Sequence, residues 1–411
     1  MNILIVKLSA IGDVVHTLPS LASLRLLYPQ AHITWVIEEA AADLIEGHPY
    51  LDRVLVSRRK HWQQDLKKGN FSKNINEIRI FMNALRDRPY DLVIDFHGLF
   101  KSAVLVWLSG GVRKLGFHSM QEGSGLFYNE KIPEDMGKHA VDRYLDFPAY
   151  LGAKSKETER PLGNTPCCHS GLDPESICGL KIMDSGFCRN DDRETEMEFF
   201  KGLSAVKNTP EFLVPADDHN LQKVSALLGK SNLDIDEPFV AMNPVALWDT
   251  KLWRQDRFAM LADRIAGELN IPVVITGSTH EKPYAESILK EAKTTKIVDL
   301  AGQTTLKDLA CLYRQAAVVV TTDSGPMHIA AAVGTPVVAL FGPTDPRRTG
   351  PYGFGHTVIR KTLPCSPCFL KQCRTRECME GITVEEVLEV VKEKLGEKTE
   401  TAEVGRKEEK L

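Results

Sequence analysis

Short apolar runs rich in β-branched residues recur along two parts of the chain, and patterns typical of amphipathic helices separate most of them. The first series lies at positions 3–7, 33–38, 52–57 and 91–96. The second series lies at positions 239–243, 273–277, 297–302, 318–323 and 337–342. Strands that alternate with helices are typical of a doubly wound parallel sheet. The pattern therefore predicts an α/β protein with two similar, Rossmann-like halves.

The length of 411 residues also suits two domains, because single domains most often hold about 100–150 residues. Positions 165–193 are rich in Cys, Gly, Ser, Asp and Pro and show no sustained period. We expect an inserted, disordered loop there, with a functional loop as the alternative. The charged C-terminal end is expected to be disordered too. The predicted segments are an N-terminal domain at 1–154, the insertion at 155–210, a connection at 211–237, a C-terminal domain at 238–395 and a tail at 396–411.

The overall charge excludes some partners. A formal net charge of −4 argues against a surface that binds nucleic acid, so an anionic partner has to meet a local basic patch. No run of about 18 apolar residues occurs, and the sequence therefore predicts no spanning helix. The first residues lack the basic region and cleavage site of a signal peptide. We expect a cytoplasmic protein.

Nine cysteines are unevenly distributed, and four of them lie close together near the C-terminal end. These four are Cys365, Cys368, Cys373 and Cys378. In a reducing compartment cysteines are thiols or metal ligands rather than a disulfide framework. The spacing allows a structural zinc site, with free thiols as the alternative.

Asp13 follows the first predicted strand and lies next to Gly12, where the backbone turns into a helix. A carboxylate at a helix N-terminus is stabilised by the helix dipole, typically by about 0.3–1 kcal/mol, so a cap explains this residue without any chemistry. Ligands of open α/β sheets, however, bind at the carboxyl ends of strands. A carboxylate placed there could accept a proton and contribute about 10²–10⁴-fold to a rate. Asp13 is a candidate general base, with the helix cap as the alternative.

Three glycine-containing turns lie at the ends of predicted strands in the second half, at 321–328, 334–336 and 341–346. The first of them opens a helix, and the free N–H groups of a helix start bind anions. Each turn alone is explained by structure, but together they favour a site for a nucleotide diphosphate. A Walker loop and a complete Gly-x-Gly-x-x-Gly are absent, which disfavours a kinase or a conventional dehydrogenase.

Lys251 lies between Trp248 and Trp253, in a loop that follows the first strand of the second half. Such loops concentrate binding residues, and a lysine there could neutralise a diphosphate leaving group. A solvated lysine beside core tryptophans is the alternative. The sequence favours the binding role.

These motifs together resemble glycosyltransferase family 9, the heptosyltransferases of lipopolysaccharide core assembly, over both halves except 155–210. The strongest part is Asp-Ser-Gly-Pro-Met-His at 323–328, followed by Gly-Thr-Pro at 334–336 and Phe-Gly-Pro-Thr-Asp at 341–345. Asp-Phe-His-Gly-Leu-Phe-Lys-Ser at 95–102 and His-Ala-Val-Asp-Arg-Tyr at 139–144 are similar to motifs of the members that add the first heptose to Kdo-lipid A. The resemblance favours that acceptor over the one used by the second transferase of the pathway.

The resemblance implies a GT-B fold and an inverting transfer from ADP-heptose that requires no metal or other cofactor. The N-terminal domain then binds the acceptor and the C-terminal domain binds the nucleotide sugar. It implies that Asp13 is the general base and that Lys251 contacts the donor phosphate. The predicted donor-binding residues are Glu281, Asp323, Ser324, Gly325, Pro326, Met327 and His328. The predicted acceptor-binding residues are Arg58, Arg59, Lys60, Lys101 and Arg143.

The basic run at 58–60 is similar to the segment that meets acceptor phosphates in this family, although composition alone describes it as an exposed charge run. Arginine binds phosphate bidentately, and polybasic segments favour anionic bilayers. We therefore expect a lipid-linked acceptor and transient peripheral contact with the inner face of the inner membrane. The alternatives are the second heptosyltransferase, a family member with another donor sugar, a nucleotide-sugar epimerase that uses NAD, and a non-catalytic nucleotide-binding protein of the same fold.

Overall fold

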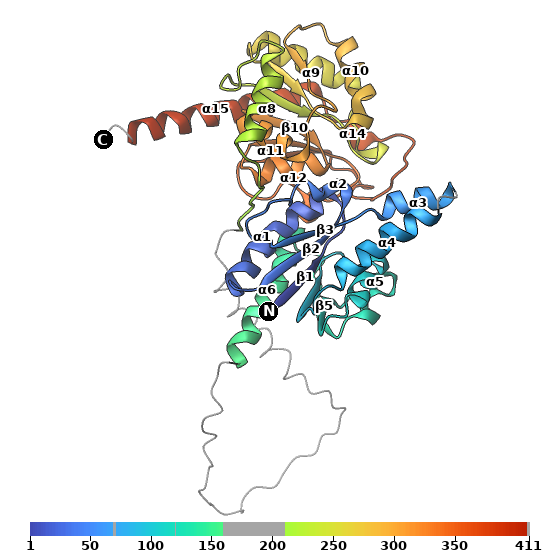
Figure 1. Ribbon diagram of the computed structural model, residues 1–411. Coiled ribbons are helices and arrows are strands. Elements are labelled where there is room, and N and C mark those ends of the chain that lie inside the picture. Colours follow the sequence, from blue (N-terminus) through green and yellow to red (C-terminus); the bar gives the residue numbers. More distant parts are fainter. Residues whose placement is uncertain (69–70, 120, 159–209, 409–411) are drawn as a thin grey trace, which may run out of the picture.

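The computed structural model describes residues 1–68, 71–119, 121–158 and 210–408, which form two six-stranded sheets (Figure 1). Every strand pairing in both sheets is parallel. The prediction of two doubly wound halves is confirmed. The predicted insertion falls mostly on residues 159–209, which lie outside the described residues.

The N-terminal sheet has the strand order β3-β2-β1-β4-β5-β6. Its strands are β1 (Asn2–Val6), β2 (His32–Glu38), β3 (Arg53–Ser57), β4 (Leu92–Asp95), β5 (Arg113–Phe117) and β6 (Glu130–Ile132). Its helices are α1 (Ile11–Leu27), α2 (Glu39–Ala42), α3 (Arg59–Lys67), α4 (Phe71–Leu85), α5 (Phe100–Leu108), the 3-10 helix η1 (Gln121–Phe127) and α6 (Ala140–Thr158). In this order the chain reverses direction across the sheet between β1 and β4, which is where Rossmann-like sheets bind ligands.

The C-terminal sheet repeats the same topology in the order β12-β11-β10-β7-β8-β9. Its strands are β7 (Val240–Asn243), β8 (Val273–Ile275), β9 (Ile297–Asp299), β10 (Val318–Thr322), β11 (Val337–Phe341) and β12 (Thr357–Arg360). Its helices are α8 (Asp218–Gly229), η2 (Asp249–Lys251), α9 (Gln255–Glu268), η3 (Thr279–Glu281), α10 (Lys282–Glu291), α11 (Leu306–Gln315), α12 (Gly325–Ala332), α13 (Pro346–Thr349), α14 (Glu377–Glu380) and α15 (Val384–Glu408). The equivalent reversal lies between β7 and β10.

Three layers of apolar packing hold the molecule together. One face of the N-terminal sheet packs against α3, α4 and α5 through Trp62, Phe81 and Val106. One face of the C-terminal sheet packs against α9, α10 and α15 through Phe258, Ile288 and Val387. A third buried cluster contains residues of both halves, among them residues of α1 and α6 from one half and of α8, α11 and α12 from the other. The two halves are therefore joined by a continuous core.

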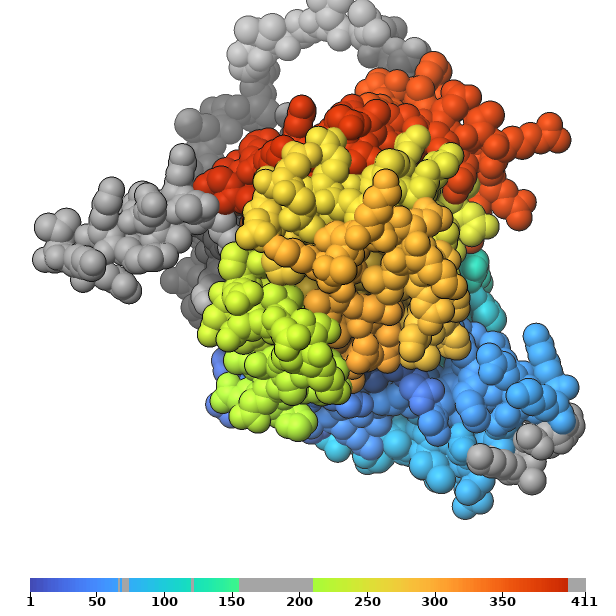
Figure 2. Space-filling model, turned by 90° about the horizontal axis from the view of Figure 1, so that it is seen from above, coloured from blue at the N-terminus to red at the C-terminus, as the bar shows by residue number. Residues whose placement is uncertain are grey.

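Helices α1 and α12 form the centre of this junction. A Cβ atom at Gly325 would lie 2.9 Å from Ile11 Cβ, and a Cβ at Gly12 would overlap the His328 ring. Only glycine permits so close an approach. Viewed from above, the C-terminal half covers much of the N-terminal half (Figure 2). The first turns of α1 and α12 meet at the junction.

The C-terminal helix α15 continues to Glu408 and extends away from the C-terminal half in Figure 1. The tail predicted from position 396 is thus helical along most of its backbone. Within the described residues, none of the helices combines the length and the apolar composition that crossing a membrane requires.

Candidate active site

The predicted functional residues follow the strands at which the two sheets reverse direction. Asp13 follows β1, and Lys101 follows β4 on the neighbouring strand. In the other half, Lys251 follows β7 and Asp323 follows the neighbouring β10. Since α1 and α12 touch, the carboxyl ends of both sheets open toward the same junction. This is the place where two Rossmann-like halves form a ligand cleft.

Asp13 lies in the first turn of α1, three residues after the N-cap residue Ala10. Its carboxylate accepts a hydrogen bond from the Ala10 backbone N–H at 3.3 Å. The helix therefore begins earlier than the sequence suggested, and Asp13 caps it from within rather than preceding it. Its side chain is 40% exposed, so the carboxylate also faces solvent. Capping and proton acceptance are compatible at this position.

A buried lysine lies behind this carboxylate. Lys7 Nζ is 3.7 Å from Asp13 Oδ2 and donates hydrogen bonds to the Tyr144 hydroxyl at 2.7 Å and to the Phe96 carbonyl at 3.0 Å. Burial opposes the charge, but nearby Asp13 and the Tyr144 hydroxyl raise the pKa of Lys7 above its usual value. Lys7 is thus charged beside the candidate base.

Three histidines meet where the two halves touch. His16 Nε2 of α1 and His328 Nδ1 of α12 share a hydrogen bond of 2.9 Å, and the ring of His139 lies 5.2 Å from the ring of His16. His139 Nε2 also pairs with the Gly350 carbonyl at 3.1 Å. Burial lowers the pKa of all three rings, to about 4 for His328. The structure therefore places His328 in the junction, where its ring contacts the other half.

Lys251 and Asp323 form a close ion pair in the C-terminal half. Lys251 Nζ lies 2.6 Å from Asp323 Oδ2, and the Thr344 hydroxyl donates to the same oxygen at 2.6 Å. The ammonium also lies 4.6 Å from the centre of the Trp248 ring. Only 6% of the Asp323 side chain is exposed, so this carboxylate depends on the lysine for compensation. The structure thus brings two predicted donor residues together.

The other predicted donor residues differ in what they face. The Ser324 hydroxyl lies 3.3 Å from Thr321 Oγ1, and Gly325 and Pro326 open α12 at the junction. The Glu281 carboxylate accepts a hydrogen bond from the Ser278 N–H at 2.7 Å and so closes the turn after β8. Met327 is fully buried in the shared core. It is therefore a packing residue of this core.

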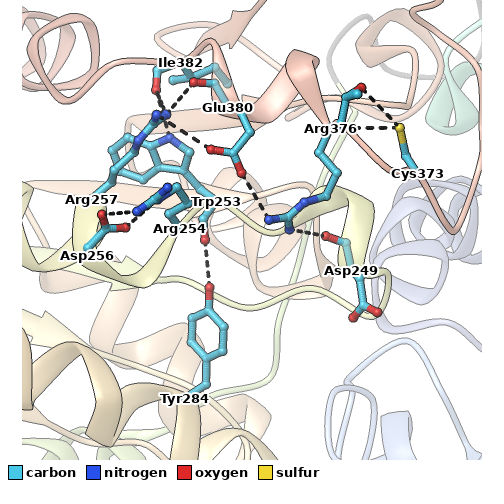
Figure 3. A network of polar contacts seen from close by, with 11 residues as sticks. Asp249, Trp253, Arg254, Asp256, Arg257, Tyr284, Cys373, Arg376, Glu380 and Ile382 are labelled. Carbon is cyan, nitrogen blue, oxygen red and sulfur yellow. Dashed lines mark hydrogen bonds and ion pairs between the residues drawn. The ribbon is translucent and has the colours of Figure 1, made fainter.

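The loop that carries Lys251 is braced from behind by the segment after β12. The Thr250 hydroxyl donates to the Leu370 carbonyl at 2.8 Å, and Arg376 donates to the Asp249 carbonyl at 3.1 Å. Figure 3 shows Arg376 and Arg257 pointing toward the same carboxylate, Glu380. These contacts hold η2 in place and so limit the movement of Lys251.

A pocket of about 390 Å³ adjoins this bracing network, lined by Leu252, Trp253, Arg254, Gln255, Asp256, Tyr284, Glu291 and Arg376. Its arginines already have partners: Arg254 pairs with Asp256 at 2.7 Å, and Arg376 pairs with Glu380 at 3.1 Å. This pocket is therefore a weaker candidate for a diphosphate site than the strand ends beside α12.

The predicted acceptor residues fall into two groups. Arg58 pairs with Glu39 at 2.8 Å, while Arg59 and Lys60 pair with the buried Glu38 at 2.8 and 3.4 Å. Lys101 is close to this group, since burial together with Arg59 and Lys60 lowers its pKa. These four residues form a basic cluster on the N-terminal half. Arg143 lies apart from it, 91% buried at its side chain and paired with Glu134 at 2.9 Å.

The four C-terminal cysteines are free thiols. Among the residues that the structure describes, no three His, Cys, Asp or Glu side chains are grouped as a metal ion requires. The arrangement of these cysteines therefore gives no support to the zinc site that their spacing allowed.

Four residues of the site were not predicted from the sequence: Lys7, Tyr144, His16 and Thr344. Lys7 ends an apolar strand six residues before Asp13, so a charged residue at the end of a buried run was the available signal. Tyr144 and Thr344 lie in the motifs at 139–144 and 341–345, but nothing in the sequence indicated their partners. His16 sits on an apolar helix, where a histidine is most often an ordinary core residue.

Comparison with protein families decides the identity. Residues 78–164 and 203–379 match the model of glycosyltransferase family 9 (heptosyltransferase). The chain belongs to this family. The resemblance drawn from the motifs is confirmed. As a member of the family, this family 9 glycosyltransferase is an enzyme that transfers a sugar.

Individual relatives agree with the family. Lipopolysaccharide heptosyltransferase 1 of Pseudomonas aeruginosa is 28% identical over 382 residues, 91% of this chain and 87% of that protein. A family 9 glycosyl transferase structure from Veillonella parvula is 21% identical, covers 96% of this chain and 97% of its own and has a TM-score of 0.69. The structure of the E. coli heptosyltransferase WaaC with ADP is 24% identical and has a TM-score of 0.67. The match covers 96% of this chain and 100% of the WaaC chain. The GT-B fold of this family 9 glycosyltransferase is thus confirmed.

Proposed function

We propose that this family 9 glycosyltransferase transfers a heptose from ADP-heptose to Kdo-lipid A in lipopolysaccharide core assembly. Heptosyltransferase 1 of Pseudomonas aeruginosa matches nine-tenths of the chain, and the E. coli relative was solved with ADP. The observation that carries the proposal is the placement of Asp13 and the Lys251–Asp323 pair on opposite halves of one junction. An inverting transfer needs a base on one side of the sugar and charge stabilisation on the other.

The chemical step follows from these positions. An acceptor hydroxyl attacks the anomeric carbon of the heptose, and the bond from that carbon to the phosphate oxygen breaks. The hydroxyl proton passes to the Asp13 carboxylate, and ADP leaves with the bonding electron pair. The Lys251 ammonium and the N-terminus of α12 stabilise the charge that develops on the diphosphate. Holding both substrates in one cleft supplies the orientation that the reaction requires.

The acceptor side is assigned to the basic cluster of Arg58, Arg59, Lys60 and Lys101. Each of the first three shares its charge with Glu38 or Glu39, so a phosphate that binds here competes with a carboxylate. Arginine favours phosphate because of its bidentate geometry. We place transient contact with the inner face of the inner membrane beside the same cluster.

The test is transfer from ADP-heptose to Kdo-lipid A by the wild type and by Asp13→Asn. The amide keeps an oxygen that can accept from the Ala10 N–H, so the helix cap survives while the base is lost. We expect kcat to fall by about 10²–10⁴-fold. ADP affinity should change little, since Asp13 lies on the other half.

Asp217→Asn is the control, because Asp217 also caps a helix with its carboxylate: as the N-cap residue of α8 it accepts from the Asn220 N–H at 3.1 Å. It should retain wild-type turnover. Unchanged turnover in Asp13→Asn would remove the base assignment. Wild-type turnover only with an acceptor that already carries a heptose would move the protein to the second transfer, and no turnover with either acceptor would refute ADP-heptose transfer to the core.

A further inference from the structure

Lys7 combines deep burial with a charge that the proposed reaction does not yet use. It is 2% exposed and follows the last residue of β1. Its ammonium meets three elements: Asp13 of α1, Tyr144 of α6 and the backbone of Phe96 after β4. An ionised lysine costs free energy in such a place unless its neighbours compensate for the charge. The compensation here comes from two hydrogen bonds, the Asp13 carboxylate and the negative charge of Asp95.

The two N-terminal motifs of the sequence converge on this ammonium. The motif at 95–102 supplies the Phe96 carbonyl, and the motif at 139–144 supplies the Tyr144 hydroxyl. Asp95 fixes the first of these by accepting from the His97 N–H at 2.8 Å and the Tyr128 hydroxyl at 2.8 Å. Both motifs therefore act, at least in part, by holding Lys7 in place.

Lys7 is also a permanent positive charge in contact with Asp13. The other titratable groups that interact with Asp13 are His97 after β4, Tyr144 of α6 and His328 of α12. Burial lowers the pKa of His97 to about 3 and that of His328 to about 4, so both rings are neutral at pH 7. Burial raises the pKa of Tyr144, which keeps its proton. Asp95 contributes a further negative charge near Lys7.

We propose that Lys7 is a positioning residue that keeps the Asp13 carboxylate ionised and oriented when anionic substrates fill the cleft. This inference rests on the proposed function. A bound diphosphate and a phosphorylated acceptor bring negative charge and exclude water, and both effects raise the pKa of a carboxyl group. A protonated Asp13 cannot accept the hydroxyl proton. The ammonium 3.7 Å away opposes this shift.

The experiment compares the pH dependence of kcat/KM in the wild type, Lys7→Met and Tyr144→Phe. Lys7→Met removes the charge at similar length, so the acidic limb should move upward by about one to three pH units. Activity lost at pH 6.5 should then return in part at pH 8.5. Tyr144→Phe keeps the Lys7 ammonium, so the acidic limb of its kcat/KM profile should lie at the same pH as in the wild type or lower. Lys223→Met, which breaks the ion pair with Asp308 between α8 and α11, is the control and should leave the limb in place.

Each outcome either supports or contradicts the proposed role of Lys7. A Lys7→Met enzyme that loses activity equally at every pH has an ordinary packing defect, and the inference is then wrong. A wild type without turnover defeats the proposed function instead, and a second measurement still tests the lysine. The carboxyl ¹³C signal of Asp13, assigned with Asp13→Asn, is titrated in the wild type with ADP bound. If Lys7 keeps the carboxylate ionised, the midpoint lies higher when the same titration is run on Lys7→Met, and equal midpoints in the two proteins would overturn the proposal.

Discussion

Lys251 and Asp323 are a pair in which each charge depends on the other. The carboxylate is 6% exposed and the ammonium 16%, so neither is compensated mainly by water. A diphosphate that enters this site adds a second anion to the same ammonium. The lysine then stabilises the leaving group while Thr344 continues to satisfy the buried carboxylate. The electrostatic stabilisation that such a shared cation provides increases as negative charge builds up on the diphosphate in the transition state.

Lys251→Met should therefore weaken ADP binding by about 10- to 100-fold, since a hydrogen bond to a charged group contributes about 1.5–3 kcal/mol. Isothermal titration calorimetry measures the change. Lys371→Met is the matched control, because the Lys371 ammonium lies 5.2 Å from the same Trp248 ring and no ion pair joins it to Asp323. Equal losses in both variants would show that general positive charge, not the Asp323 pair, attracts the nucleotide.

At the scale of elements, the contact between α1 and α12 sets how the two halves face each other. Gly12 lies against the His328 ring, and Gly325 lies against Ile11. Both glycines belong to the first turn of their helix, next to a candidate functional carboxylate. Any side chain at Gly12 would force the helices apart and move Asp13 relative to Lys251.

Gly12→Ala should lower the free energy of unfolding by about 1–3 kcal/mol, the usual cost of overpacking a well-packed contact. It should lower turnover as well, because the base shifts. Gly229→Ala is the control, since its Cβ meets nothing within 4 Å and the change should stabilise α8 by up to about 1 kcal/mol. Urea denaturation and the transfer assay measure both effects. A Gly12→Ala protein with wild-type stability would mean that the junction yields easily.

The sequence predicted most strands of both sheets and the family motifs, but not three further strands or the contacts at the junction. β5, β6 and β12 were missed because charged residues such as Arg113, Lys131 and Arg360 leave only very short apolar runs in these strands, of which β6 and β12 are edge strands. Asp13 and Asp323 could be placed at strand ends from the alternating pattern alone. Their partners Lys7 and Thr344 could not, because tertiary packing brings those pairs together.

At the scale of the whole molecule, polar contacts join the halves around the shared core. The Tyr352 hydroxyl donates to Asp142 at 2.7 Å, and Lys307 donates through its backbone to Asp43 at 2.9 Å. The three histidines of the junction lie among these contacts. His16 Nδ1 is buried and has no hydrogen-bond partner among the residues that the structure describes, so protonation would place an uncompensated charge at the centre of the molecule.

These histidines should make the junction sensitive to acid. A ring whose pKa falls from 6.5 to about 4 on folding, as at His328, binds fewer protons in the folded state between those values. Its contribution to stability is therefore complete above pH 6.5 and is lost as the pH falls toward 4. The pKa of His16 is also lowered, chiefly by burial and by His328, so the two rings resist protonation together.

Thermal melting between pH 7.5 and pH 4.5 tests this with His16→Gln and with His280→Gln, an exposed histidine of η3, as control. The melting temperature of the wild type should fall more steeply with acid than that of His16→Gln, since the variant has one ring less to protonate. The control should parallel the wild type, because both carry the same carboxylates and the same junction. Parallel curves for all three proteins would locate the acid sensitivity in the carboxylates.

If the halves separate first, small-angle scattering at pH 4.5 should show a larger radius of gyration while the far-ultraviolet circular dichroism is retained, because each sheet keeps its own second layer of helices.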